Sequence, residues 1–465
     1  MRHILRRRKL LAFLLLALVT TLVAAGVRAS TQREARAAEN SARAAASLRE
    51  AAWPLRGTDD DYDPLMEMIG DAQFVLLGEA SHGTRDFYHE RARITQRLIE
   101  EKGFNAVAIE GNWPDAERVN RYIRNMGTDK TAEEALSGFT QFPEWMWRNT
   151  EVRDLARWLR TYNDSLPTFA RRIGFYGLDL YSPFESAVAV ADYLEPIDAE
   201  AARRAREVYE CLTSSGDSEF SYGRAVAANP EASCARLAQE QVEDLERRAV
   251  EPVAGLGPSR REDLFSALQN ARVVRDGEEY FRVSFAGSAS TWNLRDTHMA
   301  ATLEHLAAHF DTPGRPGKIV AWAHNTHMGD ARATQMGEAG ELNVGQLMRE
   351  RFGDQAVLVG FTTYTGSVIA ASQWDEPGQR MNVLPALAGS YSAHFHNAGI
   401  GDFLLVLRGT ENAAALLGPS RLERAIGVIY LPQSERFSHY FDARLAEQFD
   451  AVIHIDESEA VEPLQ

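Results

Sequence analysis

The chain has 465 residues, of which 45% are hydrophobic and 25% are charged, and this composition excludes an intrinsically disordered protein. Its formal net charge is −16 at pH 7, and its arginines and lysines form no basic stripe. Because nucleic acids attract basic surfaces, an acidic chain of this kind is a poor candidate for binding DNA or RNA.

The first 29 residues have the pattern of a secretory signal peptide. Met1 to Lys9 is basic without any acid, Leu10 to Val27 is apolar, and Val27-Arg28-Ala29 places small residues where a signal peptidase cleaves. We therefore expect residues 1–29 to be removed and the protein to be secreted or periplasmic. Because the apolar stretch is long for a signal peptide, an uncleaved membrane anchor is the alternative, and it would be the only contact with a membrane. Residues 30–55 are expected to form a polar helical tether.

From residue 56 to 465, short apolar runs alternate with helical stretches such as Asp86–Lys102 and Asp115–Arg124. The strand candidates are Phe74–Leu77, Ala106–Ile109, Ile173–Leu178, Ile319–Ala323, Val357–Phe361, Phe403–Leu407, Gly427–Leu431 and Ala451–Ile455. This alternation predicts an α/β domain with a mainly parallel sheet that is flanked by helices on both faces.

One stretch, residues about 185–300, contains no convincing strand and is charged and helical. We interpret it as an all-helical insertion between two strands of the sheet. It holds both cysteines of the chain, Cys211 and Cys234. In an exported protein two cysteines this close favour a disulfide, which would contribute on the order of 3 kcal/mol, and two unpaired thiols are the alternative.

Polar side chains follow four of the predicted strands. They are Glu79 and His82 after the first strand, Glu110 after the second, Asp179 after the third, and His324 and His327 after the fourth. Taken singly, each of these residues could equally well be a capping or loop residue without a role in a site. Because parallel strands end at the same edge of a sheet, we expect these groups to meet there and to form a site.

Arg91 adds a charged group to this site. It falls at the edge of the apolar stripe of the predicted helix Asp86–Lys102. A buried arginine needs a carboxylate, and Glu79 and Glu110 are the candidate partners. The alternative is that the side chain of Arg91 reaches solvent past the start of the helix.

The chain lacks the signatures of several catalytic classes. It has no Gly-x-Ser-x-Gly motif, no cysteine near a strand end, no P-loop and no dinucleotide-binding glycine motif. Water therefore remains as a nucleophile, since a histidine held by a carboxylate can take its proton, and protonated His324 or Arg91 could stabilise the resulting oxyanion. The alternative is a divalent metal, for which the candidate ligands are Glu79, His82, Glu110 and His324.

Several long motifs resemble the erythromycin esterase family, and the resemblance covers nearly everything after about residue 60. The motifs are Gly78-Glu-Ala-Ser-His-Gly-Thr84, Gly103-Phe-Asn-Ala-Val-Ala-Ile-Glu110, Phe142-Pro-Glu-Trp-Met-Trp-Arg-Asn149, Tyr176-Gly-Leu-Asp179, Trp292-Asn-Leu-Arg-Asp296, Ala323-His-Asn-Thr-His-Met328, and Gly427-Val-Ile-Tyr-Leu-Pro through Ser438-His-Tyr-Phe441.

The resemblance implies hydrolysis of a cyclic ester by activated water, without a covalent intermediate. It leaves metal dependence open, so we expect no cofactor, with a divalent metal as the alternative. It implies that His82 is the general base and that the residues around it are Glu79, Arg91, Glu110, His324 and His327. Asp179, Trp147 and Arg148 are expected to support the site or to bind substrate, although an aromatic cluster is more often part of a core. Arg295 and Asp296 are expected to form a structural ion pair.

Members of the family differ in substrate, and an exported, acidic member departs from the pattern of a cytoplasmic enzyme of macrolide antibiotic resistance. The expected partner is therefore a small-molecule ester or lactone of unspecified structure. Two alternatives keep the same fold. One is a hydrolase that depends on a divalent metal, and the other is a non-catalytic protein of ligand binding or envelope polysaccharide assembly.

Overall fold

The computed structural model describes residues 42–216, 218–250, 257–285, 290–410, 413–418 and 420–464. The chain forms two compact units, Met1–Ala52 and Trp53–Gln465. In the first unit residues 42–51 are helical, whereas the predicted signal peptide and the start of the predicted tether lie outside the described residues. None of the helices within the described ranges is both long enough and apolar enough to span a bilayer.

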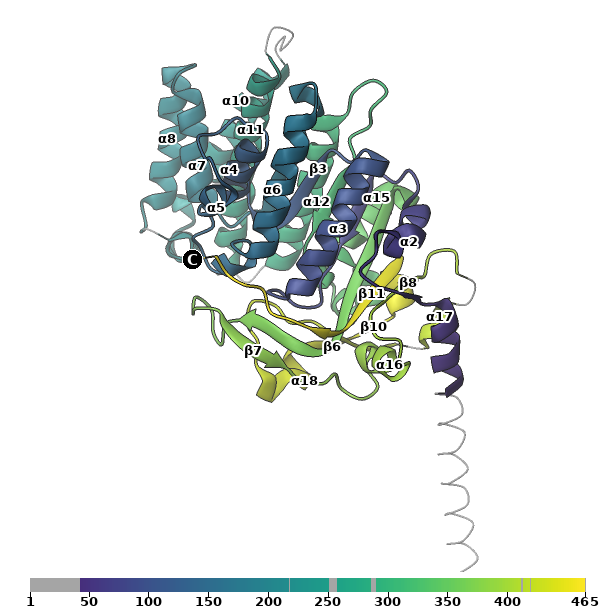
Figure 1. Cartoon of the computed structure of the whole chain (residues 1–465). Coiled ribbons are helices and arrows are strands. Elements are labelled where there is room, and N and C mark those ends of the chain that lie inside the picture. Colours follow the sequence, from purple (N-terminus) through teal and green to yellow (C-terminus); the bar gives the residue numbers. More distant parts are fainter. Residues whose placement is uncertain are drawn as a thin grey trace, which may run out of the picture. The chain divides into compact units, whose positions relative to one another are not determined.

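The described part of the second unit is built on a nine-stranded sheet with the order β1-β8-β11-β6-β2-β5-β3-β4, and β7 pairs with β6 (Figure 1). The strands are β1 (Trp53–Pro54), β2 (Phe74–Leu77), β3 (Ala106–Asn112), β4 (Gly174–Asp179), β5 (Ile319–Trp322), β6 (Ala356–Ala370), β7 (Gln379–Val383), β8 (Phe403–Val406) and β11 (Ala451–Ser458). A separate antiparallel pair consists of β9 (Arg421–Arg424) and β10 (Tyr440–Ala443).

Neighbouring strands from β11 to β4 are all parallel, and β1, β8 and β7 pair in the antiparallel direction. This confirms the predicted mainly parallel sheet. Every residue of β2 and of β5 is buried, which explains why both strands are continuous apolar runs rather than alternating patterns.

Helices cover both faces of the sheet, as predicted. Val75 of β2 belongs to the core that contains residues of α3, whereas the neighbouring Phe74 packs against Phe352 of α15 on the other face, with ring centroids 4.6 Å apart. The helices outside the insertion are α2 (Asp63–Ile69), α3 (Arg85–Lys102), α4 (Trp113–Ile123), α5 (Ala132–Leu136), α6 (Thr150–Ser165), α13 (Asn325–Met328), α14 (Gln335–Glu338), α15 (Val344–Phe352), α16 (Tyr391–Asn397), α17 (Ala413–Leu417), α18 (Glu435–Ser438) and α19 (Leu445–Gln448).

Between β4 and β5 the described residues contain helices and no strand. The helices are α7 (Pro183–Leu194), α8 (Ala199–Thr213), α9 (Glu219–Ala228), α10 (Ala235–Val250), α11 (Pro258–Ser284) and α12 (Thr291–Phe310). They bury cores of their own, one of which contains residues of α7, α8, α10 and α11. A disulfide joins Cys211 to Cys234, as predicted, and links the end of α8 to the residue before α10.

The predicted strand Gly427–Leu431 is wrong. Its neighbourhood makes isolated bridges only, from Ile426 to Ser81 and from Ile429 to Ala371. The segment therefore passes from one partner to another without running along either, and of its apolar residues Tyr430 is buried, Val428 and Ile429 are half-buried and Leu431 is exposed. The short strands β1, β7, β9 and β10 were missing from the prediction, and β7, with the sequence Gln-Arg-Met-Asn-Val, is largely polar and exposed.

Candidate active site

The loop after β2 carries Glu79 and His82, and neighbouring segments fix its backbone. Gly78 N–H donates to the Val359 carbonyl (2.8 Å), and His82 N–H donates to the Ile426 carbonyl (3.0 Å). A Cβ atom on Gly78 would lie 2.2 Å from the side-chain oxygen of Asn325, so only glycine fits where the strand gives way to the loop. The positions of both functional side chains therefore follow from the end of a buried central strand.

A chain of charged contacts orients the ring of His82. Its Nδ1 lies 2.6 Å from Glu79 Oε1, and the other oxygen of Glu79 accepts a hydrogen bond of 2.8 Å from Arg91 Nη2. Glu79 and Arg91 are fully buried. The guanidinium of Arg91 lies 4.5 Å from the Tyr88 ring centroid and 4.7 Å from that of Trp322. Arg91 therefore pairs with Glu79, one of its two predicted partners, and does not reach solvent.

This arrangement leaves the second ring nitrogen of His82 available. Because a carboxylate accepts at Nδ1, that nitrogen carries the proton and Nε2 presents a lone pair when the ring is neutral. Nε2 makes no hydrogen bond with any residue that the structure describes, and Glu110 Oε1 lies 4.0 Å from it. The ring of His324 lies close by, with its centroid 5.0 Å from that of His82.

Glu110, which lies in β3, is surrounded by donors. Its Oε2 accepts from the backbone N–H of His324 (2.8 Å), and its Oε1 accepts from Arg295 Nη2 (2.9 Å) and lies 3.4 Å from His327 Nε2. Burial raises the pKa of the Glu110 carboxyl, but the positive charges of His327, His82 and Arg295 outweigh burial and hold the pKa well below its usual range. Glu110 is therefore ionised at neutral pH.

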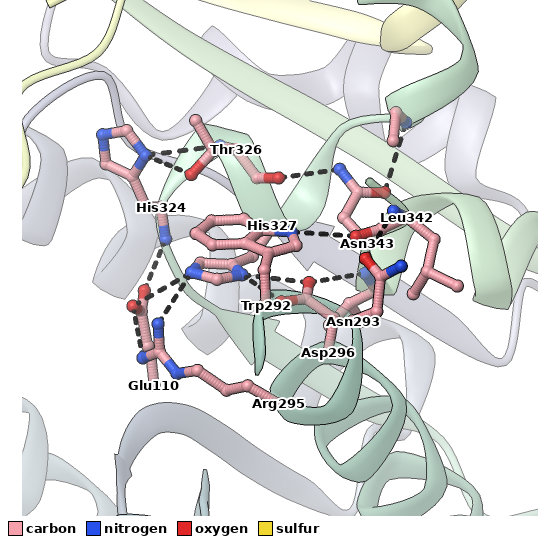
Figure 2. A network of polar contacts seen from close by, with 12 residues as sticks. Glu110, Trp292, Asn293, Arg295, Asp296, His324, Thr326, His327, Leu342 and Asn343 are labelled. Carbon is pink, nitrogen blue, oxygen red and sulfur yellow. Dashed lines mark hydrogen bonds and ion pairs between the residues drawn. The ribbon is translucent and has the colours of Figure 1, made fainter. Parts of the chain in front are cut away.

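His327 is the centre of the network in Figure 2. Its Nδ1 lies 3.0 and 2.9 Å from the two carboxylate oxygens of Asp296, and its ring stacks on Trp292 with centroids 4.3 Å apart. The backbone N–H of Val344 donates to Asp296 and fixes that carboxylate (2.9 Å). Burial lowers the pKa of His327, but Asp296 and Glu110 outweigh burial and raise the pKa to about 9. His327 is therefore protonated at neutral pH.

Arg295 connects Asp179 to Glu110. It forms a two-pronged ion pair with Asp179, with distances of 3.0 Å from Nε to Oδ1 and 2.6 Å from Nη2 to Oδ2. The expectation that Arg295 and Asp296 form an ion pair outside the site is wrong, because each instead binds a member of the site. The signal that pointed to them is the motif Trp292-Asn-Leu-Arg-Asp296, in which Trp292, Arg295 and Asp296 all contact the site.

His324 is held in the opposite tautomer to His82. Its Nδ1 accepts a hydrogen bond from the backbone N–H of Thr326 (3.3 Å) and lies 2.8 Å from the hydroxyl of the same residue. The proton therefore resides on Nε2, which is buried and has no partner among the described residues. Burial, followed by the positive charge of His82, holds the pKa of His324 well below its usual range.

The expectation of a protonated His324 is therefore wrong. The ring is neutral because burial disfavours its charged form, and any positive charge on His82 would disfavour that form further. Its Nε2–H makes no hydrogen bond of good geometry within the described chain, and the backbone carbonyl of Ala80 is the acceptor nearby that raises its pKa. Such a group can donate a hydrogen bond to an oxygen of a bound molecule.

The two remaining predicted residues differ in their placement. Trp147 is buried, and its Nε1 donates to the backbone carbonyl of Glu110 (2.9 Å). The side chain of Arg148 instead pairs with Glu144 at 3.3 Å, and the structure gives it no contact with the charged groups above. Trp147 therefore supports the site, whereas Arg148 lies apart from it.

The four residues considered as metal ligands do not fit a metal ion in this arrangement. The oxygens of Glu79 are committed to His82 and Arg91, and the oxygens of Glu110 are committed to Arg295 and to a backbone N–H. In the described ranges no group of three or more His, Cys, Asp or Glu side chains has the geometry of a metal site.

Comparison with known proteins places this arrangement in context. Residues 99–458 match the sequence profile of the family described as erythromycin esterase. The chain is 24% identical over 433 residues to the erythromycin esterase type II of Escherichia coli, and the match covers 88% of this chain and 96% of the relative.

Two solved structures are similar in fold. A protein described as a succinoglycan biosynthesis protein has a TM-score of 0.72 and 22% identity, and the match covers 91% of this chain and 98% of that chain. An erythromycin esterase mutant in its open conformation has a TM-score of 0.59 and 18% identity, with 86% and 94% covered.

Proposed function

This chain belongs to the erythromycin esterase family, and membership of that family favours the activity of an ester hydrolase. We propose that the chain cleaves a lactone or another carboxylic ester with water activated by His82. The observation that carries the proposal is the chain of contacts Arg91–Glu79–His82, which ends in a ring nitrogen without a hydrogen-bond partner among the described residues. A histidine oriented by a buried carboxylate is suited to act as a general base.

In the proposed reaction His82 Nε2 takes a proton from water, and the water oxygen forms a bond to the ester carbonyl carbon. The carbonyl oxygen becomes an oxyanion and accepts a hydrogen bond from the neutral Nε2–H of His324. Collapse of the tetrahedral intermediate breaks the bond to the alcohol oxygen, which takes the proton back from His82. The carboxylate of Glu79, which is paired with Arg91, stabilises the transient imidazolium.

Glu110 has a distinct role in this proposal. Its carboxylate stays ionised, lies 4.0 Å from His82 Nε2 and is fixed by Arg295 and His327. An oxygen at that distance is suited to accept the second hydrogen of a water molecule that donates its first to Nε2. It would also stabilise the positive ring of His82 after proton transfer.

The surroundings of Ser81 support water as the nucleophile. The hydroxyl of Ser81 lies 2.5 Å from the hydroxyl of Thr84, and both groups are buried. No hydrogen bond from Ser81 to a histidine is found in the described chain. Ser81→Ala is therefore the matched control for His82→Ala, one position away on the same loop.

The test is a screen of purified protein against a panel of lactones, macrolides included, and acyl esters. On a substrate that is turned over, His82→Ala should lower kcat by about two to four orders of magnitude with little change in KM. Ser81→Ala should remain largely active. An inactive Ser81→Ala variant, together with an acyl adduct on Ser81 in the wild type, would refute the activated-water mechanism.

We propose that the enzyme works outside the cytoplasm. The support is the pattern of residues 1–29 and the disulfide between Cys211 and Cys234, since disulfides persist in oxidising compartments. The amino terminus of the exported protein should begin near Ser30. An intact Met1 on exported protein would show that the apolar segment serves as an anchor.

A second candidate is a non-catalytic role in envelope polysaccharide assembly. It is favoured by the description of one similar structure as a succinoglycan biosynthesis protein. The substrate screen separates the two candidates, because a binding protein would retain sugar ligands without turning over any ester. The intact set of Glu79, His82 and Arg91 favours the hydrolase.

A further inference from the structure

The segment Glu459–Leu464, here named the strap, follows β11 and is hydrogen-bonded to the loop that carries His82. Arg85 N–H donates to the Glu459 carbonyl (2.7 Å), and Val461 N–H donates to the Gly83 carbonyl (3.0 Å). Thr84 and Ala460 form an antiparallel bridge between these two bonds. The strap therefore lies along the residues that immediately follow His82.

The strap also binds the first turn of α3, the helix that carries Arg91. Glu459 N–H donates to the carboxylate of Asp86 (2.6 Å), and the side chains of Arg85 and Glu459 form an ion pair at 2.7 Å. The start of α3 and the loop before it are thus held by the same residue. Both Arg91 and His82, the two ends of the chain of contacts through Glu79, depend on backbone that the strap contacts.

A third contact of the strap is with the segment that follows Trp147. Leu464 N–H donates to the Arg148 carbonyl (2.9 Å), and Thr150 N–H donates to the Glu462 carbonyl (3.1 Å). Trp147 itself donates to the backbone of Glu110. The strap therefore joins the His82 loop to the backbone that supports Glu110, although the two are separate in sequence.

Gly83 is the residue through which the strap acts most directly on His82. Its carbonyl accepts from both Val461 N–H (3.0 Å) and Ile369 N–H (3.1 Å). It adopts a positive φ of 66°, and a Cβ atom there would lie 2.3 Å from the Ile369 carbonyl and 2.8 Å from Trp145. The neighbour of His82 is thus confined on several sides, and the strap provides one of them.

We propose that the strap is a positioning element of the active site, which holds His82 at the place where its Nε2 can act on water. The kinetic part of this inference rests on the proposed function, whereas the structural part does not. A displacement of about 1 Å in a catalytic group can cost about a hundredfold in rate. Loss of the strap's bond to Gly83 is therefore expected to change kcat much more than KM.

The decisive variant is Val461→Pro, which removes the N–H that donates to Gly83 and retains an apolar side chain. The preceding residue, Ala460, is in an extended bridge, which is the conformation that a following proline favours. Val461→Ala is the matched control, because it keeps the N–H and removes most of the buried side chain. Both variants are expected to lose stability, but only one loses the hydrogen bond to the loop.

Two measurements are made on each full-length variant: amide hydrogen exchange over residues 79–86, and kcat and KM on the substrate found in the screen. For Val461→Pro we expect faster exchange in that loop and a kcat lower by about tenfold or more, with KM within about twofold. For Val461→Ala we expect exchange in the loop and kcat close to the wild type.

Equal exchange in the loop and equal kcat for Val461→Pro and the wild type would overturn the proposal, as would equal losses in both variants. If Val461→Pro does not fold, Ser367→Ala decides, because it removes the acceptor of the Ala460 N–H bond (3.0 Å) on the other side of the strap. If the protein hydrolyses no ester, hydrogen exchange still tests the strap, so the two failures are distinguishable.

Discussion

The role of Glu79 can be measured by breaking its buried ion pair with Arg91. Arg91→Met removes the charge and retains a flexible apolar side chain that can still pack between the rings of Tyr88 and Trp322. Within the described part of the chain, Glu79 then keeps only His82 as a side-chain partner for its carboxylate. Both members of the pair are fully buried, so no solvent replaces the lost guanidinium.

The expected cost is a loss of about 3–5 kcal/mol in the free energy of unfolding, because breaking a buried pair leaves an uncompensated charge. Arg97→Met is the matched control on the same helix. Its two carboxylate partners, Glu101 and Asp63, are both exposed, and an exposed pair contributes about 0–1 kcal/mol. The two arginine variants should therefore differ by roughly 3 kcal/mol in stability.

The assay combines urea unfolding with turnover. Arg91→Met should remain folded in the absence of urea but lose activity, because the carboxylate of Glu79 is no longer fixed by Arg91 and therefore orients the ring of His82 less firmly. The double variant Glu79→Gln with Arg91→Met removes the unpaired charge, so it should recover most of the stability and none of the activity. A stability loss below about 1 kcal/mol for Arg91→Met, together with normal kcat, would refute this account of the pair.

Three further predictions concern other parts of the molecule. The folded-state pKa of His327 is about 9, above its unfolded value, so its contribution to stability is complete below about pH 6.5 and is lost as the pH rises through 9. The difference in free energy of unfolding between wild type and His327→Gln should therefore shrink between these pH values. A constant difference would contradict the raised pKa. Mass spectrometry without reduction should find Cys211 linked to Cys234, and reduction should lower the free energy of unfolding by about 3 kcal/mol; free thiols in protein from an oxidising compartment would contradict the link. Extensive chelation should leave ester hydrolysis intact, whereas a loss that zinc or manganese restores would support the metal-dependent alternative.

The parts of the fold that sequence predicted well are those in which burial on both faces dictates composition. The strand Phe74–Leu77 has the predicted bounds, because every position in it is buried. The polar strand β7 lacks that signal, since it lies off the main order of the sheet and exposes most of its residues. In Gly427–Leu431 the apolar run resembles a strand, but only Tyr430 is buried, and the segment makes isolated bridges without joining the sheet.

The candidate site was predictable where it depends on strand ends and unpredictable where it depends on the insertion. Glu79, His82 and His324 follow parallel strands and Glu110 lies near the end of one, so the sheet brings them together. Arg295 reaches Glu110 from α12, and nothing in the helical pattern of the insertion shows where that helix returns. The neutral state of His324 could not be predicted either, because the charge of a histidine depends on burial and on neighbouring groups that the sequence does not show.

The position of β5 in the sheet has a consequence for the order in which the protein forms. Strands β2 and β3 are consecutive along the chain but do not touch, because β5 lies between them and pairs with both. The other neighbour of β2 is β6, which comes later still. When the helical insertion has been synthesised, neither β5 nor β6 has yet been made, so β2 has no hydrogen-bonded neighbour at that stage.

Such an unpaired apolar strand is prone to wrong association, and pairing across so long a connection is slow. The loop with His82 is synthesised early, but the strand before His324 must insert between β2 and β3 before the two histidines can meet. Assembly of the candidate site is consequently a late event in the folding of this chain, and a fragment that ends before β5 would leave the site incomplete even with Glu79, His82, Arg91 and Glu110 all present.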